Sequence, residues 1–285
     1  MSSYNDSSRF KGFWLSLPAM VWLGLFFILP LFIVLAVSFL SRGKGGVPLL
    51  PPTLEHYERS LDVFSSVLLR SIGIAGLTTL ICLIIGYPMG WFISTRKNAF
   101  VRQLCLFLVI LPFWTNFLVR TYAWRILLGE EGTINSFLQS LGLIQEPIPM
   151  LNTPFAVIVG LVYGFLPFMV LPIYAIVERF DFRFIDAAND LGANDWKSFW
   201  KVIFPITLPG VYAGCALVFI PSVGAYITPD LLGGTKGLMI GNLIQKQFGG
   251  SGNMPLGSAL SIIMMVIVMI SLLFYVRFGT RESGS

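Results

Sequence analysis

Charged side chains and catalytic motifs are scarce in this sequence. Asp, Glu, Lys and Arg make up 12% of the 285 residues, and His56 is the one histidine. The sequence contains no GxxxxGKS or GxxxxGKT phosphate-binding loop, no HExxH and no GxSxG. These absences exclude nucleotide binding through a P-loop and the common hydrolase sites. We therefore predict a chain that is not an enzyme and holds no cofactor of its own, and we expect His56 to lie solvated on a loop.

Cysteine is equally rare, with Cys82, Cys105 and Cys215 each inside an apolar stretch. Their spacing fits no metal site, so we interpret them as small buried hydrophobic residues. The net charge is +5, but the basic residues are scattered and form no stripe with interleaved aromatics. Nucleic acid is therefore not an expected partner.

Long apolar stretches dominate the chain, since 55% of the residues are hydrophobic. Six stretches free of Asp, Glu, Lys and Arg come near or exceed the ~20 residues that a membrane-spanning helix needs. The first is about twice as long as the apolar part of a secretory signal, so we interpret it as an uncleaved anchor. We predict an all-α polytopic protein of the lipid bilayer with six transmembrane helices, within Gly12–Ser41, Ser71–Thr95, Gln103–Val119, Pro147–Val177, Val202–Pro229 and Gln247–Val276.

The distribution of basic residues predicts the orientation. The stretch 96–102 has three basic residues and no acid, whereas Glu130, Glu131 and Glu146 follow the third span. Cytoplasmic loops carry an excess of Lys and Arg. We therefore place both termini and the loops 96–102 and 178–209 in the cytoplasm, an arrangement that puts eleven of the 19 basic residues inside and eight outside.

We divide the chain into three parts. Residues 1–65 hold an N-terminal cytoplasmic segment, the first span and an outer loop. In that loop the Gly- and Pro-rich stretch 42–52 cannot continue a helix, and 53–65 begins as a short amphipathic helix on the outer surface. Residues 66–278 form the transmembrane domain, and 279–285 a tail.

Several predicted spans contain proline, which we expect to kink or locally open the helices. Such breaks occur where helices line a path, although membrane helices also tolerate proline without any role in transport. The sequence alone leaves both readings open for Pro88, Pro112, Pro167, Pro172 and Pro221.

The loop 178–209 is rich in charged and aromatic residues that recur at helical spacing. Gly192 stands where one helix could stop and another begin, which predicts a helix-turn-helix offering an apolar face to a partner. Small residues at 187 and 188 would let that partner approach closely. Pro205 would form a rigid corner at the entry to the fifth span.

This loop resembles the EAA motif of ABC importer permeases, E-A-A-x3-G-x9-I-x-L-P. The matching positions are Asp186, Ala187, Ala188, Gly192, Val202, Phe204 and Pro205, with Asp for Glu, Val for Ile and Phe for Leu. The resemblance implies a type I importer permease fold, in which these residues dock on a separate ATPase that binds ATP and Mg.

A wider resemblance covers most of the chain. Segments 111–124, 160–169 and 226–242 are similar to the polyamine (spermidine/putrescine) permeases of the PotB type, whose relatives carry opines, phosphonates or ferric iron. It implies a bacterial inner-membrane importer with a homologous second permease, a cytoplasmic ATPase dimer and a periplasmic binding protein. An ion-coupled secondary transporter is the alternative, but we see no carboxylate deep inside a predicted span.

A polyamine is a flexible polycation, so its path needs carboxylates and aromatic faces near the mouth. Asp230 beside Tyr226 is the best-placed carboxylate, although it could equally be a helix cap or a salt-bridge partner. Trp114, Tyr122 and Trp124 gather at the end of the third span and could instead belong to an interfacial belt. Arg120 would serve as a gate latch, paired with Glu130, Glu131 or Asp230.

Overall fold

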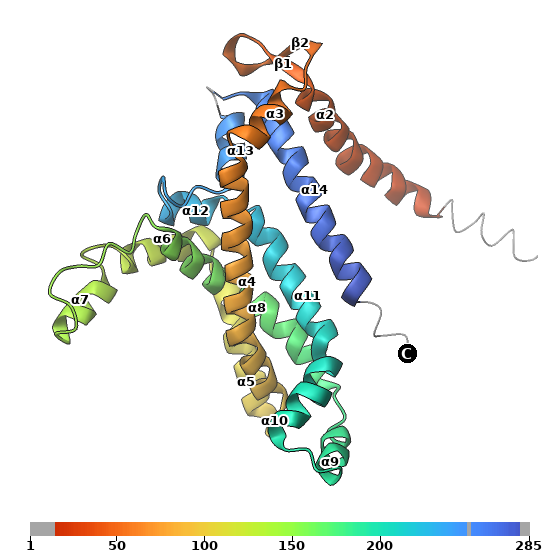
Figure 1. Ribbon diagram of the computed structural model, residues 1–285, viewed down its shortest axis with the longest axis vertical. Coiled ribbons are helices and arrows are strands. Elements are labelled where there is room, and N and C mark those ends of the chain that lie inside the picture. The colour runs from red at the N-terminus through yellow and green to blue at the C-terminus, as the bar shows by residue number, and fades with distance from the viewer. Residues whose placement is uncertain (1–14, 250–251, 280–285) are drawn as a thin grey trace, which may run out of the picture. The chain divides into compact units, whose positions relative to one another are not determined.

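The computed structural model describes residues 15–249 and 252–279 (Figure 1). These residues fall into two compact units. The first contains the chain up to Phe64 together with Ile244–Ile263, and the second contains Ser65–Leu243 and the chain from Met264 onward. The fold is helical apart from one two-stranded sheet, so the predicted all-α class is confirmed. The division at residues 65 and 278 stays a prediction.

The first unit begins with the helix Leu15–Ser38, which includes the π-turn η1 (Gly24–Ile28) and α2 (Leu29–Ser38). Strands β1 (Leu40–Arg42) and β2 (Pro48–Pro52) then pair antiparallel around the short 3-10 turn η2 (Lys44–Gly46). The helix ends at Ser38, and the Gly- and Pro-rich stretch 42–52 forms no α-helix, as expected.

The predicted amphipathic helix is α3 (Glu55–Asp62), but the prediction that His56 is solvated was wrong. His56 is 5% exposed, and its Nε2 lies 3.1 Å from the carbonyl oxygen of Leu40 in β1. Ser60 on the same helix is also buried, and its Oγ donates to the carbonyl oxygen of His56 at 2.6 Å. A hairpin contact of this kind depends on pairing that the local sequence does not show.

Three long helices form the core of the second unit: α4 (Ser65–Ser94), α8 (Pro154–Glu178) and α11 (Phe204–Val223). Their packed side chains include Tyr87, Met169, Ile173 and Val218. A Cβ added at Gly210 would lie 3.0 Å from the carbonyl oxygen of Pro172, so glycine permits the close approach of α11 to α8. The last helix, α14 (Met254–Gly279), contributes to both units.

Among the residues that the structure describes, five helices are long and apolar enough to cross a membrane, and a bent pair brings the number of candidate spans to six if it counts as one span. The bent pair is the predicted third span. The chain runs through α5 (Ala99–Ile110) and η3 (Leu111–Trp114), then turns by 92° into α6 (Phe117–Leu127). Pro112 has no N–H to donate, and the Asn116 side chain accepts from the backbone N–H of Leu118 at 2.8 Å, so a new helix starts there. The predicted third span is thus present as a bent pair, and the break expected at Pro112 takes the form of this turn.

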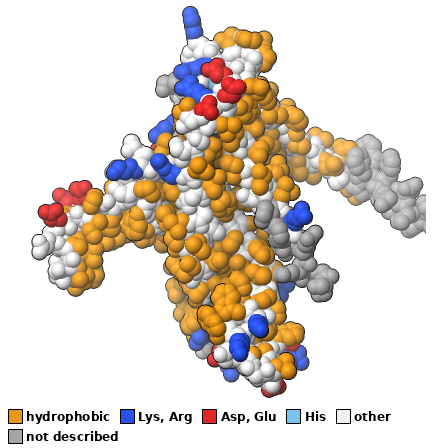
Figure 2. All heavy atoms as spheres, viewed as in Figure 1, with side chains coloured by type: hydrophobic (Ala, Val, Ile, Leu, Met, Phe, Trp, Pro, Cys, Tyr) orange, Lys and Arg blue, Asp and Glu red, His pale blue; other side chains and the backbone are white. Residues whose placement is uncertain are grey.

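The other predicted proline breaks are milder. Helix α4 continues through Pro88, α8 through Pro167 and Pro172, and α11 through Pro221. On the face in Figure 2, hydrophobic side chains cover most of the surface along α4, α5 and α11, and charged ones gather at the end that carries α9 and α10. This distribution suits helices surrounded by lipid.

The remaining helices are short: α7 (Thr133–Ser140), α9 (Arg183–Asp190), α10 (Asp195–Ser198), α12 (Ile227–Leu232) and α13 (Ile240–Phe248). The π-turn η4 (Phe199–Ile203) joins α10 to α11. The segment between α12 and α13 is attached to α4, since Ser71 Oγ accepts from the backbone N–H of Ile240 at 2.8 Å and Arg70 donates to the carbonyl oxygen of Lys236 at 3.0 Å.

Candidate functional site

The loop between α8 and α11 folds as two helices around a tight turn, which we call the elbow (residues 183–198). Gly192 has φ +82°, and its N–H donates to the carbonyl oxygen of Asn189 at 2.9 Å. The N–H of Ala193 donates to the carbonyl oxygen of Ala188 at 3.0 Å. These two bonds end α9 in a Schellman motif, which needs a left-handed residue at this position. The predicted helix-turn-helix is confirmed.

Side chains hold the two helices of the elbow together. Asn194 caps α10 by accepting from the backbone N–H of Lys197 at 2.9 Å. Ser198 in α10 donates from Oγ to Oδ1 of Asn189 in α9 at 3.2 Å. Before α9, the Arg183 side chain donates to Asp181 and lowers the pKa of that carboxyl below its ordinary value. The elbow is therefore a defined element and not a loose connector.

The elbow exposes apolar side chains at its tip. Leu191 is 90% exposed and Trp196 is 69% exposed. Asp186 and Ala187 are exposed on α9, and Ala188 is half-buried. Exposed apolar groups beside small residues and a carboxylate suit a protein partner that packs closely on α9.

Aromatic rings connect the elbow to the core. The ring of Tyr87 in α4 lies 5.7 Å from that of Phe199 and 5.9 Å from that of Phe204. On the other side, Trp91 in α4 lies 6.1 Å from Phe182. Movement of the elbow would reach α4 and α11 through these contacts.

The predicted corner at Pro205 was wrong. Residues Asp195–Val223 form one helical run, in which Pro205 occupies the first turn of α11 directly after the π-turn η4. The π-turn accommodates the N–H that Pro205 lacks, because the backbone N–H of Phe204 already donates to the carbonyl oxygen of Phe199, five residues back, and so interrupts the α-helical pattern just before the proline. The elbow is thus joined to the predicted fifth span without a break.

Sequence reasoning missed a second attachment, at the end of α8. Glu178 accepts from the hydroxyl of Tyr174 at 2.6 Å, and it forms a salt bridge with Arg102 of α5 at 3.5 Å. The spacing of four residues between Tyr174 and Glu178 was the one local signal. The partner Arg102 could not be inferred, because it lies far away in the sequence.

The residues predicted to line the cargo path lie on α6, on or just before α12 and on η3. Helices α6 and α12 contact each other, and η3 lies before the bend. Asp230 is exposed in the first turn of α12, which packs against α6. Tyr226 precedes α12 and accepts from Nδ2 of Asn242 at 2.8 Å through its carbonyl oxygen. Tyr122 is exposed on α6, and Trp124 packs edge-on against Tyr163 of α8 at 5.5 Å.

Trp114 lies apart from these residues, on η3 before the bend. It is 78% exposed, and its ring lies 6.3 Å from that of Phe107 in α5. The structure therefore groups Asp230 and Tyr226 near α6 and leaves Trp114 with α5.

Arg120 has none of the expected carboxylate partners. Within residues 15–249 and 252–279, the salt bridges are Arg102–Glu178 and Arg183–Asp181. The Arg120 Cζ instead lies 5.4 Å from the ring centroid of Phe113 and 5.6 Å from that of Phe117.

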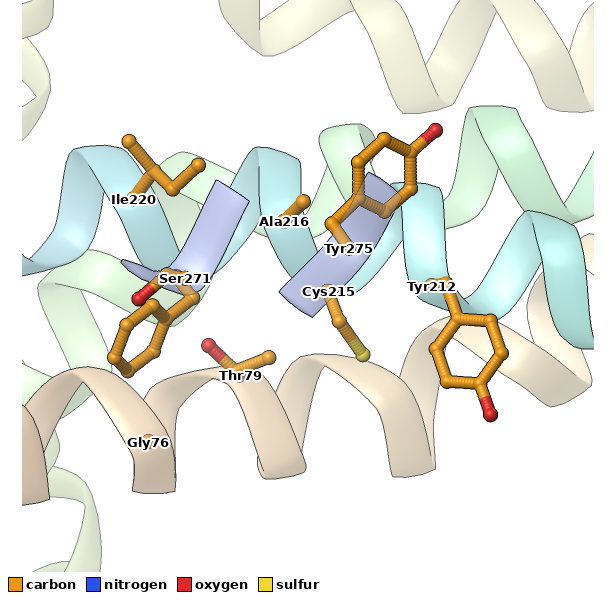
Figure 3. A pocket seen from close by; sticks show the side chains of 9 residues that line it. Gly76, Thr79, Tyr212, Cys215, Ala216, Ile220, Ser271 and Tyr275 are labelled. Atoms are coloured by element: carbon orange, nitrogen blue, oxygen red, sulfur yellow. The ribbon is translucent and has the colours of Figure 1, made fainter. Parts of the chain in front are cut away.

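Two open grooves of similar size flank the core. One, of about 480 Å³, is lined by three prolines from different segments, Pro88, Pro112 and Pro167. The other, of about 440 Å³, lies between α4, α11 and the end of α14 (Figure 3). No charged side chain lines either groove, and the hydroxyls of Thr79 and Ser271 in the second bond within their own helices.

Comparison with known proteins identifies the family to which this helical fold and its elbow belong. Residues 84–283 match the family described as the binding-protein-dependent transport system inner membrane component. The chain is 44% identical over 257 residues to the spermidine/putrescine transport system permease protein PotB of Haemophilus influenzae, covering 90% of each. It is 31% identical to the inner membrane ABC transporter permease protein YdcU of Escherichia coli, covering 76% of this chain and 72% of that protein.

Solved structures agree on the fold. A chain of the bacterial alginate ABC transporter in complex with a periplasmic protein superposes with a TM-score of 0.75 at 16% identity, covering 100% of this chain and 99% of that one. A chain of the MetNI methionine ABC transporter gives a TM-score of 0.59, also at 16% identity, over 78% and 97%.

The resemblance to ABC importer permeases is therefore confirmed, and the alternative of an ion-coupled secondary transporter is withdrawn. A transport system of this family works with an ATPase and a binding protein, which explains an elbow with an exposed face and a chain without nucleotide-binding motifs. The chain belongs to the binding-protein-dependent family of inner-membrane components, as a multi-pass permease subunit of an ABC transporter.

Proposed function

We propose that this permease carries a polyamine of the spermidine/putrescine class from the periplasm to the cytoplasm. The observation that carries the proposal is the 44% identity to PotB permeases, which extends over 90% of the chain. An alignment of this length includes the elbow and the other loops between the helices, and not the membrane spans alone.

The proposed complex contains a homologous second permease, two copies of a cytoplasmic ATPase and a periplasmic binding protein. Both termini and the elbow lie on the cytoplasmic side. ATP binding closes the ATPases, which push the elbow through Asp186, Ala187, Ala188 and the Gly192 turn. Phe204 and Pro205 pass the displacement into α11, and the path opens outward; hydrolysis then resets it.

At the outer end, Asp230 and Tyr226 receive the ammonium groups of the cargo, with Tyr122, Trp124 and Trp114 offering aromatic faces. The exposure of Asp230 and the contact between α12 and α6 support the grouping of Asp230 and Tyr226 with Tyr122 and Trp124, whereas Trp114 would face the cargo separately, from η3. Carboxylates and aromatic faces are the groups that bind alkylammonium ions in proteins.

Reconstitution tests the proposal. The four components are placed in proteoliposomes with ATP inside, and uptake of radiolabelled spermidine and putrescine is measured. ATP-dependent, binding-protein-dependent uptake is the expected result. Uptake of an opine, a phosphonate or ferric iron in place of polyamines would assign the permease to a different cargo within the same importer class.

A further inference from the structure

Arg120 is a charged residue whose guanidinium group has no hydrogen-bond acceptor and no carboxylate partner among the described residues. It lies in the first turns of α6, just after the 92° bend of the predicted third span. Its Nε and Nη1 are buried and have no hydrogen-bond partner. No carboxylate of the described chain forms a salt bridge with it.

Aromatic rings surround the guanidinium in place of acceptors. Phe113 and Phe117 lie within the ~6 Å over which a ring face attracts a cation. A small cavity beside the side chain is lined by Thr121, Trp124, Gly160, Tyr163 and Gly164, and its volume of about 10 Å³ leaves room for little more than one water. The hydroxyl of Thr121 donates to the carbonyl oxygen of Phe117 at 2.9 Å. The positive charge is thus positioned without being neutralised.

Burying part of a charged group without hydrogen-bond partners costs folding free energy, so such a charge is more easily explained by a functional role. An arginine that is partly buried at the outer end of a predicted span ordinarily pairs with an acid or faces water. Here Nε and Nη1 are enclosed, whereas Nη2 is not among the enclosed atoms. Because the residue as a whole is only half-buried, part of the side chain is exposed, on the helix that also carries Tyr122 and packs against α12.

A fixed positive charge at such a place repels cations. Repulsion between two unit charges a few ångströms apart is strong where water is partly excluded, and an arginine at a constriction is an established way to exclude cations from a pore. Pairing Arg120 with Glu130, Glu131 or Asp230, as a latch would, would cancel this repulsion.

We propose that Arg120 is a tethered cation that bars uncoupled passage of cations through the permease. This inference rests on the proposed function, in that it places the cargo path beside α6. Because the helix restarts at Asn116, α6 can reorient relative to α5, and reorientation during ATP-driven opening would move the charge aside. The barrier then applies to the resting state and not to coupled transport.

The test is passive ion leak in proteoliposomes that contain the whole complex without ATP. Efflux of potassium and choline is compared for the wild type, Arg120→Gln, Arg120→Met and Arg120→Lys. Arg125→Gln is the matched control, since Arg125 is exposed on the same helix. We expect the two neutral variants to raise cation efflux on the order of tenfold, and Arg120→Lys and Arg125→Gln to remain as tight as the wild type.

Three results would overturn the barrier. Neutral variants could leak no more than the wild type, or they could leak glucose as readily as potassium, which would indicate loosened packing. The third is that neither neutral variant co-purifies with the ATPase while Arg120→Lys does, which would make the charge structural. Potassium and choline are not the proposed cargo, so an error in the cargo would show separately, as failed polyamine uptake by the wild type.

Discussion

The hydroxyl of Tyr87 in α4 lies 2.9 Å from Oγ1 of Thr207 in α11, and both side chains are buried. Phe199 and Phe204, which follow the elbow in the chain, pack on the Tyr87 ring. This pair therefore joins two membrane helices at the place where motion of the elbow would enter the core. In a complex driven by a separate ATPase, such a joint has to be rigid to transmit movement.

The two members of this pair should respond unequally to mutation. Thr207→Val leaves the Tyr87 hydroxyl buried without a partner, which costs about 1–3 kcal/mol. Tyr87→Phe leaves Thr207 bonded to the carbonyl oxygen of Phe204 at 3.1 Å, so we expect a smaller loss of about 0.5–1.5 kcal/mol. Unfolding of the purified permease by denaturant in detergent measures both losses. Equal losses would show that the hydroxyl finds another partner.

The Gly192 turn should separate coupling from assembly. Asparagine and aspartate both tolerate the left-handed conformation and have nearly the same size, so Gly192→Asn and Gly192→Asp differ chiefly in charge. We expect Gly192→Asp to insert and to leave binding-protein docking intact, while ATP hydrolysis no longer drives uptake. Gly192→Asn should remain coupled.

Uptake and ATPase activity of the two Gly192 variants are measured in parallel in proteoliposomes. Normal uptake and normal co-purification of the Gly192→Asp complex would remove the elbow from the coupling mechanism. Loss of uptake in both variants would assign the effect to backbone conformation rather than to charge.

Helix packing should be sensitive at Gly210 and insensitive at Gly73. A methyl group at Gly210 would meet a backbone oxygen at 3.0 Å and Ile176 at 2.9 Å, whereas one at Gly73 would meet nothing within 4 Å. We expect Gly210→Ala to destabilise the permease by about 1–3 kcal/mol. Gly73→Ala should be neutral or slightly stabilising, because alanine favours a helix. The same denaturant assay checks both, and equal stability of the two variants would contradict the close packing of α11 on α8.

The carboxylate of Asp230 should affect cargo affinity and not ATPase assembly. Asp230→Asn removes one negative charge from the proposed outer site, so the apparent KM for spermidine should rise on the order of tenfold. Asp62→Asn, at an exposed acid of α3, is the matched control and should leave KM unchanged. Uptake kinetics in proteoliposomes decide the matter, and unaltered affinity and rate would exclude Asp230 from the path.

Much of the elbow was predictable because its structure is local. The helix-ending glycine at 192 and the small residues at 187 and 188 act within a few residues of one another. The corner at Pro205 was predicted wrongly, since the π-turn that lets the helix run on through Pro205 leaves no clear signal in the sequence. The attachment of Glu178 to Arg102 could not be predicted, because it joins two helices that the chain visits separately.

The amino-acid sequence by itself determined that the chain is a helical membrane protein, where most of its spans lie, and which loop folds as a helix-turn-helix. These properties follow from the length of apolar runs and from backbone preferences over a few residues. Only the tertiary structure decided that the third span bends by as much as 92°, that His56 is buried, that Arg120 lies beside aromatic rings without a salt bridge, and that Tyr87 meets Thr207. Each of these features depends on groups from other elements or on competition between a straight helix and a new cap. Such contacts arise only when the helices pack.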